Sequence, residues 1–370
     1  MSLSPPAPSS TPPRTRARVV VAMSGGVDSS AAAGLLWERG HDVVGVTLKL
    51  YDAKGTAASI GGRCCTPRDI DDARATANHF GFPHYVVDES EAFAKGVIDD
   101  FVANHRLART PNPCVRCNEK MKFGPLVRFA RAVGAEALAT GHYARVEVGA
   151  QGLRLRRAID REKDQAYFLF AVKPELFSYV QFPLGEMTKP EVRACAQRLG
   201  LPNWDKADSH EICFIPDGNH KAFVEARGGA GPAGAIVDES GRTVGEHGGT
   251  HHFTVGQRKG LPGIGGEERR FVVRIEAATG KVVIGPRRDL GRQEVTVTDA
   301  RWLRPVEPGP IRCAVQIRHH SAAHPATVVS RGAGGEVEVR FDQPAEGVSP
   351  GQAAVFFRDD EVLGGGWIGG

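Results

Sequence analysis

Residues 19–30 read Val-Val-Val-Ala-Met-Ser-Gly-Gly-Val-Asp-Ser-Ser, an apolar run that leads into two glycines and a group of hydroxyl side chains. The apolar run at residues 19–23 is typical of a buried strand, and residues 29–39 have the pattern of a helix. Two glycines let the backbone approach an anion closely, and the helix N-terminus supplies unpaired amides and the positive end of its dipole. We therefore predict a phosphate-binding loop between the first strand and the first helix.

The loop differs from the common nucleotide-binding loops. It lacks the Gly-Lys-Ser/Thr ending of a Walker A loop, and it is not a GxGxxG turn. Asp28 would repel a phosphate unless a cation lies between them, so we interpret it as a residue that helps to hold Mg²⁺ on a pyrophosphate. A plain glycine turn with serines that cap a helix would explain the other residues but not Asp28.

The stretch resembles the SGGxDS signature of the PP-loop ATP pyrophosphatases. Members of that superfamily split ATP between its α and β phosphates and use AMP to activate an oxygen of the substrate. The resemblance implies ATP and Mg²⁺ as cofactors and adenylation as the reaction. Small-molecule synthetases and tRNA-modifying enzymes share this loop, so the loop does not identify the substrate.

Working outward from the loop, apolar and amphipathic runs alternate as far as about residue 225, which predicts a parallel sheet covered by helices. Beyond residue 226, short alternating runs between glycine-rich turns predict an all-β part. The expected fold class is α/β, with a PP-loop (adenine nucleotide alpha hydrolase-like) parallel-sheet domain, a small β domain and a C-terminal β-barrel. The expected boundaries are 1–17 for a disordered tail, 18–225 for the catalytic domain, 226–286 for a small β linker domain and 287–370 for the barrel.

Composition narrows the class of protein. The 370 residues include 47 Lys and Arg against 43 Asp and Glu, and a net charge of +4 does not by itself indicate a nucleic-acid partner. The charge is uneven, because residues 106–131 hold seven Lys or Arg and one acid, whereas residues 336–361 hold seven acids and two Arg. The seven Cys are an odd number, and neither a membrane span nor a signal peptide is evident, so we expect a cytoplasmic protein without a disulfide framework.

Residues 110–120 combine a Pro-x-Pro entry with a CxxC pair, Cys114 and Cys117, and we expect a helix to begin at Asn118 or Glu119. A thiol at a helix N-terminus beside basic residues has a favoured thiolate, which makes it a better nucleophile. Structural zinc and an iron–sulfur or other redox role remain as alternatives, although no second CxxC is present. Cys213, between apolar neighbours, would by itself be a buried structural cysteine.

Further fragments follow the loop in a fixed order, namely TPNPCVRCN at 110–118, ATGHY at 139–143, KDQAYFL at 163–169, CFI at 213–215, GQRKGL at 256–261, GQAAVF at 351–356 and GGG at 364–366. In this order and spacing they resemble the tRNA-specific 2-thiouridylase family, over nearly all of residues 18–370. The resemblance implies that AMP is attached to the C2 oxygen of the wobble uracil of tRNA. It also implies that Cys213 carries a persulfide, that Cys117 is the nucleophile that completes the transfer, and that the two pass through a disulfide.

The same resemblance implies binding residues by position. For ATP they are Ala22, Met23, Ser24, Gly25, Gly26, Val27, Asp28, Ser29, Leu48 and Gly141. For tRNA they are Asn112, Pro113, Cys114, Lys163, Asp164, Gln165, Arg318 and His319.

Cys114 departs from the pattern of some relatives, which have Asp at this place as a proposed acid or base. Three alternatives stay open: the thiol takes over the proton transfer, another group such as Asp28 or water does so, or Cys114 pairs with Cys117 in a disulfide or cluster. We predict no zinc, because the pairs His251-His252 and His319-His320 lack a third ligand at metal-binding spacing.

The sequence thus predicts an enzyme, a Mg-ATP-dependent tRNA-uridine 2-sulfurtransferase that binds the anticodon stem-loop of tRNA. Its expected second partner is a persulfide-donating sulfur-relay protein, and neither a membrane nor DNA is expected as a partner. One alternative is a PP-loop synthetase that adenylates a small molecule. The other is a noncatalytic RNA-binding protein whose CxxC holds a metal.

Overall fold

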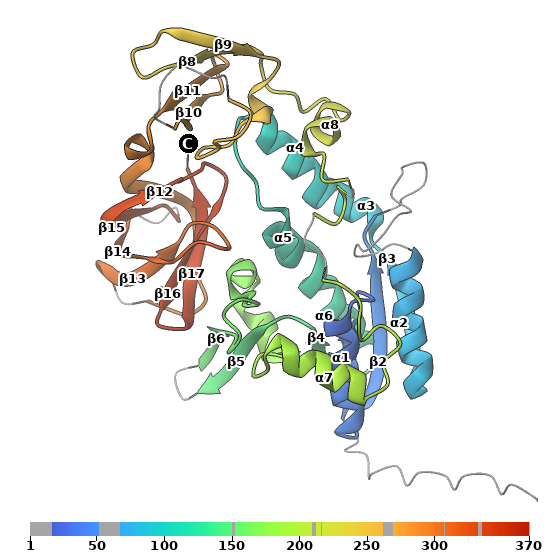
Figure 1. Cartoon of the computed structure of the whole chain (residues 1–370). Coiled ribbons are helices and arrows are strands. Elements are labelled where there is room, and N and C mark those ends of the chain that lie inside the picture. Colours follow the sequence, from blue (N-terminus) through green and yellow to red (C-terminus); the bar gives the residue numbers. More distant parts are fainter. Residues whose placement is uncertain are drawn as a thin grey trace, which may run out of the picture.

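The computed structural model describes residues 17–51, 67–149, 152–208, 212–215, 217–261, 269–306, 308–331 and 335–369. Nearly all of the predicted tail, residues 1–17, and both Cys64 and Cys65 lie outside these ranges. Figure 1 shows the parallel sheet with its helices on one side of the molecule, the barrel on the other, and the small β unit above them.

The N-terminal part is built on a parallel five-stranded sheet of order β3-β2-β1-β4-β7. Its strands are β1 (Arg18–Ala22), β2 (Asp42–Lys49), β3 (His84–Asp88), β4 (Ala137–Thr140) and β7 (Val180–Gln181). The predicted parallel sheet is therefore confirmed. Because successive side chains of a strand point to opposite faces, Val19 and Val21 pack on one side and Val20 on the other.

Helices cover both faces of this sheet. Three share the core of Val19 and Val21: α1 (Val27–Glu38), α2 (Pro67–Phe80) and α7 (Lys189–Arg198). On the opposite face α6 (Phe123–Ala132) packs its apolar side chains into the core of Val20. Every helix among the described residues is too short or too polar to cross a membrane.

A helical arm leads from β3 to α6. Its helical pieces, two of them π-helical turns, are α3 (Ser90–Phe93), η1 (Ala94–Ile98), α4 (Asp99–Arg106), α5 (Pro113–Arg116) and η2 (Cys117–Lys122). Beyond β4 lie the 3-10 turns η3 (Ala166–Leu169) and η4 (Pro174–Tyr179). The arm carries the CxxC and faces the barrel.

The small β unit is a four-stranded sheet of order β10-β11-β8-β9. Its strands are β8 (Gly234–Val237), β9 (Thr243–His247), β10 (Phe271–Glu276) and β11 (Lys281–Gly285). Helix α8 (His220–Glu225) precedes the unit, and the turns η5 (Thr250–His252) and η6 (Arg287–Leu290) lie within it and after it. A small core of Ile236, Val272, Val282 and Ile284 holds the sheet together.

The C-terminal strands close into an antiparallel barrel, because β12 pairs with both β15 and β17. The barrel strands are β12 (Gly291–Trp302), β13 (Ile311–Gln316), β14 (His324–Ser330), β15 (Val337–Glu346), β16 (Ala353–Arg358) and β17 (Glu361–Ile368). The hairpin of β5 (Ala144–Gly149) and β6 (Gly152–Arg157) extends the barrel sheet through the pairing of β6 with β17. A segment that follows β4 in sequence thus belongs to the barrel sheet in space.

Candidate active site

The predicted phosphate loop connects β1 to α1. Gly25 has φ of +72°, and a Cβ there would lie 2.7 Å from the carbonyl carbon of Asp69 and closer still to its oxygen. At Gly26, by contrast, the nearest atom to an added Cβ is Ser24 Oγ at 3.6 Å. The residue before α1 is Gly26, and in the described chain no side chain caps this helix start. The first backbone N–H groups of α1 can therefore donate to an external anion. The loop therefore fits a phosphate group.

Side chains within and behind the loop hold it in place. Ser29 Oγ accepts a hydrogen bond from Ser24 N at 3.1 Å and donates to Gly26 O at 3.0 Å. The buried hydroxyl of Ser30 lies 3.1 Å from Thr76 Oγ1 on α2. Ser29 and Ser30 thus support the loop from inside.

The other predicted ATP residues gather at the same end of the sheet, because β1, β2 and β4 are adjacent and parallel. Ala22 ends β1 and Met23 follows it, Leu48 lies near the end of β2, and Gly141 follows β4. A Cβ at Gly141 would lie 2.7 Å from Ser29 N, so β4 and α1 approach as closely as glycine allows.

Asp28 is paired with a lysine that the sequence did not indicate. Its Oδ1 accepts hydrogen bonds from Lys189 Nζ at 2.6 Å and from Tyr143 Oη at 2.9 Å. Burial raises the pKa of Tyr143, and the charge of Asp28 raises it further, so the phenol remains a donor. Within the described chain the contacts of the Asp28 carboxylate all use Oδ1, which leaves Oδ2 as an oxygen of the kind that Mg²⁺ prefers.

The same lysine reaches the segment that precedes Cys213. Lys189 Nζ lies 2.8 Å from Asp208 Oδ1, and Asp208 also binds Lys163 at 2.8 Å and Arg193 at 3.1 Å. Burial raises the pKa of Asp208, but the hydrogen bonds from Lys163 and Lys189 outweigh it and lower the pKa to about 2. Asp208 is therefore a carboxylate at any physiological pH.

The CxxC lies inside a helix, which corrects the sequence expectation. Helix α5 begins at Pro113, and the side chain of Asn112 caps it by accepting from Val115 N at 3.2 Å. An asparagine cap followed by proline is a common helix start, and this signal was present in the sequence. Cys114 is exposed in the first turn, whereas Cys117 is buried one turn further on. The helix N-terminus therefore acts mainly on Cys114.

The basic side chains next to the CxxC make contacts with groups other than the two thiols. Arg116 lies 2.9 Å from Glu119, and its guanidinium stacks 3.9 Å above the ring of Trp367 on β17. Lys120 donates to the backbone oxygen of Gly96 at 3.3 Å. These side chains join the arm to itself and to the barrel.

Cys117 and Cys213 converge on one apolar cluster although they are far apart in sequence. Cys117 belongs to a large buried cluster that extends from the sheet through the helical arm to the barrel, and the half-buried Cys213 packs against the same cluster. The next residue, Phe214, contacts Phe93 and Phe101 of the arm with ring centroids 5.7 and 5.4 Å apart. The structure thus packs the segment of Cys213 against the helical arm, which also carries Cys117.

The predicted tRNA residues of the KDQ fragment make internal contacts. Lys163 binds Asp208, and Gln165 Oε1 accepts from Tyr143 N at 3.0 Å. Asp164 is buried and accepts from Arg157 Nη1 and Ala158 N, both at 2.9 Å.

The other predicted tRNA pair lies on the barrel. Arg318 Nη2 donates to Val255 O and to Ser349 Oγ, both at 2.7 Å. His319 Nε2 lies 3.2 Å from Asp164 O, and its ring centroid lies 4.2 Å from that of Phe168 in a tilted arrangement. His319 thus brings the barrel pair next to the KDQ fragment.

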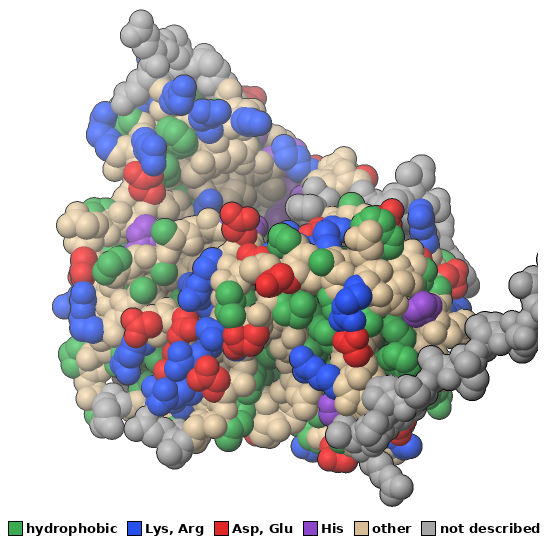
Figure 2. All heavy atoms as spheres, turned by 60° about the horizontal axis from the view of Figure 1, so that its bottom comes forward, with side chains coloured by type: hydrophobic (Ala, Val, Ile, Leu, Met, Phe, Trp, Pro, Cys, Tyr) green, Lys and Arg blue, Asp and Glu red, His purple; other side chains and the backbone are tan. Residues whose placement is uncertain are grey.

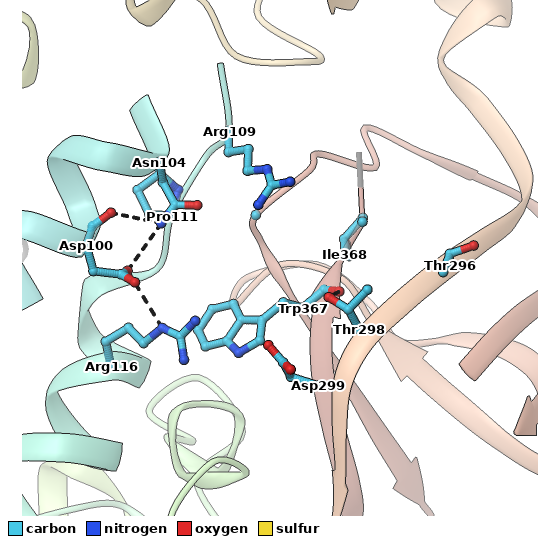
Figure 3. Close-up of a pocket in the computed structure, with 12 residues that line it drawn as sticks. Asp100, Asn104, Arg109, Pro111, Arg116, Thr296, Thr298, Asp299, Trp367 and Ile368 are labelled. Atoms are coloured by element: carbon cyan, nitrogen blue, oxygen red, sulfur yellow. Dashed lines mark hydrogen bonds and ion pairs between the residues drawn. The ribbon is translucent and has the colours of Figure 1, made fainter. Parts of the chain in front are cut away.

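A cavity of about 290 Å³ lies between the arm and the barrel. Figure 3 shows the guanidinium of Arg109 pointing into it from the chain before α5, with Arg116 and Trp367 below. The barrel also contacts this part of the arm through Thr110 N, which donates to Pro350 O at 2.7 Å. Over the face shown in Figure 2, basic and acidic side chains are interspersed, so the charge there is not of one sign.

The histidine pair His251-His252 has a third partner, and the expectation that it lacks one is wrong. Glu225 Oε1, distant in sequence, lies 3.0 Å from His251 Nε2 and 2.8 Å from His252 Nε2. However, His251 Nδ1 accepts from Gly231 N at 3.2 Å, so the proton is on Nε2 and points at Glu225. In this tautomer the group is a hydrogen-bonded link between α8 and η5, and the absence of zinc stays a prediction.

Three family models match the chain. The tRNA methyl transferase HUP domain matches residues 17–217, the tRNA methyl transferase PRC-barrel domain matches 221–286, and the aminomethyltransferase beta-barrel domain matches 292–368. Together with the observed sheets, these matches confirm the predicted fold class. Among solved structures, a 4-thiouridine synthetase–RNA complex with bound ATP is similar over 57% of this chain and 50% of that chain, at 16% identity and a TM-score of 0.35, which is too distant to bear on function.

Curated relatives are similar over nearly the full length. The tRNA-specific 2-thiouridylase MnmA of Rhodospirillum centenum is 49% identical over 95% of this chain and 91% of its own length. The protein of the same name from Geobacter metallireducens is 47% identical over 96% of this chain and 97% of its own length. This chain therefore belongs to the tRNA-specific 2-thiouridylase family.

Proposed function

We propose that this protein is a tRNA-uridine 2-sulfurtransferase that uses ATP and Mg²⁺ to replace the C2 oxygen of the wobble uridine of tRNA by sulfur. Membership of the 2-thiouridylase family supports the reaction class. The observation that carries the proposal is that the Cys213 segment packs against the arm that holds Cys117, in a chain that also has a phosphate loop. A tRNA substrate implies a cytoplasmic enzyme.

The phosphate loop is the proposed site of ATP. The uncapped amides of α1, together with Gly25 and Gly26, are suited to the phosphates, and Asp28 Oδ2 is suited to the metal ion. Mg²⁺, when bound, offsets negative charge on the pyrophosphate. Adenylation turns the uracil C2 oxygen, a poor leaving group, into one that departs with AMP.

Sulfur transfer needs two thiols. The terminal sulfur of the Cys213 persulfide bonds to C2 of the adenylated uracil, and AMP leaves with the oxygen. The Cys117 thiolate then attacks Cys213 Sγ, which breaks the S–S bond and leaves sulfur on the base. The products are 2-thiouridine and a Cys117–Cys213 disulfide, and a thiol reductant restores both cysteines by supplying two electrons. The persulfide itself comes from a sulfur-relay protein.

The anticodon stem-loop of tRNA is proposed to lie across the arm and the barrel. The cavity there adjoins Pro111, the residue before Asn112 and Pro113, which are predicted to bind tRNA. Arg109 points into it, and a guanidinium is a strong donor to phosphate oxygens.

The experiment that tests the function measures 2-thiouridine in unmodified tRNA after incubation with the protein, Mg-ATP and a persulfide donor. We expect thiolation by the wild type and none by Cys117→Ala or Cys213→Ala. Cys313→Ala, which removes a thiol of the barrel strand β13, is the matched control and should retain activity. Thiolation by Cys213→Ala at the wild-type rate would contradict the two-cysteine mechanism.

A further inference from the structure

A single buried ammonium joins two functional segments of this protein. Lys189 is 7% exposed, and its Nζ lies 2.6 Å from Asp28 Oδ1 of the phosphate loop and 2.8 Å from Asp208 Oδ1. Asp208 begins the segment that leads to Cys213. No motif of the sequence analysis includes Lys189, so its place between these carboxylates comes from the fold alone.

The backbone holds Lys189 firmly in this place. Lys189 is the first residue of α7, and its N–H donates to Asp160 Oδ2 at 2.8 Å. A capping box between Thr188 and Glu191 fixes the same helix start. Because both the hydrogen bond to Asp160 and the capping box hold its backbone, Lys189 is preorganised to orient the carboxylate that its side chain contacts.

The geometry points to Lys189 as a positioning residue for nucleotide binding, and to Asp208 as the group that holds Lys189 in place. The ammonium and Tyr143 both contact Asp28 Oδ1, which leaves Oδ2 as the oxygen that the proposed function assigns to the metal ion of Mg-ATP. The inference rests on the proposed function only in one respect, namely that the bound nucleotide is ATP. It predicts that Asp208, which belongs to the cysteine segment, also controls the affinity for ATP.

The direct test is the affinity of the full chain for Mg-ATP, measured by equilibrium dialysis without tRNA or a sulfur donor. Lys189→Met should weaken binding about 10- to 100-fold, because the hydrogen bond to a charged group that orients Asp28 is lost. Lys189→Arg keeps the cation and should recover most of the affinity, whereas a merely space-filling role would be served equally well by methionine. Lys95→Met is the control, because Lys95 is largely exposed and pairs with Glu91 on the surface.

A double-variant cycle tests the role of Asp208. If Asp208 acts through Lys189, Asp208→Asn weakens Mg-ATP binding on its own, and adding it to Lys189→Met causes no further loss. The inference would be overturned if the two losses of affinity multiplied in the double variant. It would also be overturned if Lys189→Met bound Mg-ATP with wild-type affinity. Thermal unfolding of each variant shows whether it folds. If Lys189→Met does not fold, the affinities of Lys189→Arg and Asp208→Asn are compared with that of the wild type instead.

The outcome is separable from that of the proposed function. Cys213→Ser should bind Mg-ATP like the wild type, because it leaves the Asp28–Lys189–Asp208 contacts intact. A wild type that binds Mg-ATP through Lys189 but does not thiolate tRNA would refute the proposed function and leave the positioning role standing.

Discussion

Gly25 of the phosphate loop lies against the backbone of Asp69 at the position where a side chain would begin, with the Asp69 carbonyl carbon 2.7 Å from an added Cβ. Lys206 fixes this contact, since its Nζ donates to Gly25 O at 3.0 Å and to Asp69 Oδ1 at 2.7 Å. The buried amide of Asn203 also donates to Gly25 O, at 3.1 Å. The loop is therefore held from behind by α2 and by the segment after α7, which leaves its other side for the ligand.

We predict that Gly25→Ala abolishes Mg-ATP binding, because the methyl group forces the loop away from Asp69. The control is Gly134→Ala, which has a similar φ of +68° but nothing within 4 Å of the added Cβ. In Gly134→Ala the unfolding free energy should fall by about 1 kcal/mol, because alanine is disfavoured in the left-handed conformation. Nucleotide binding by this variant should be normal. Equal nucleotide affinity of the two variants would show that the close contact is unimportant.

The barrel is attached to the arm partly through Trp367, which is 8% exposed and stacks on Arg116. Trp367→Ala should lower the unfolding free energy by about 3 kcal/mol in urea denaturation, since it removes a large buried side chain. Trp204→Ala, at a tryptophan that is 40% exposed, should cost less than about 1 kcal/mol. Similar losses at the two sites would argue against a tight contact between arm and barrel.

The acid stability of the protein should depend on Asp208. The folded pKa of about 2 is below the ordinary value of 3.8, so its contribution to stability is complete above pH 3.8 and is lost as the pH falls through about 2. Acid unfolding followed by circular dichroism should show the wild type more stable than Asp208→Asn above pH 4. The difference should shrink between about pH 4 and pH 2, and a difference that stays constant over this window would contradict the assignment.

The two thiols of the CxxC should differ in reactivity. Cys114 is exposed in the first turn of α5, and Cys117 is buried. Mass spectrometry of peptides after brief treatment with iodoacetamide at neutral pH should therefore find Cys114 alkylated faster than Cys117. Faster alkylation of Cys117 would mean that the arm opens in solution.

The sequence was informative wherever the structure depends on local pattern. The run from Val19 to the loop glycines has the period of a buried strand followed by a helix, and both were found within a residue or two of the expected places. The start of α5 was missed, although Asn112 and Pro113 are a readable helix start.

Contacts between distant segments were beyond the sequence. Lys189 meets Asp28, and Glu225 meets His251, only because the sheets bring their elements together. The pairing of Arg156 on β6 with Glu361 on β17 likewise joins segments of two expected domains. Periodicity records which face of an element is buried but not which partner covers it.

The central claim is tested most directly by locating sulfur within the tRNA. Unmodified tRNA is incubated with the wild-type protein, Mg-ATP and a persulfide donor, digested to oligonucleotides and analysed by tandem mass spectrometry. We predict an oxygen-to-sulfur mass shift that is confined to the wobble uridine of the anticodon fragment and that requires ATP. A tRNA that stays unmodified, or a mass shift at another nucleotide, would contradict the account.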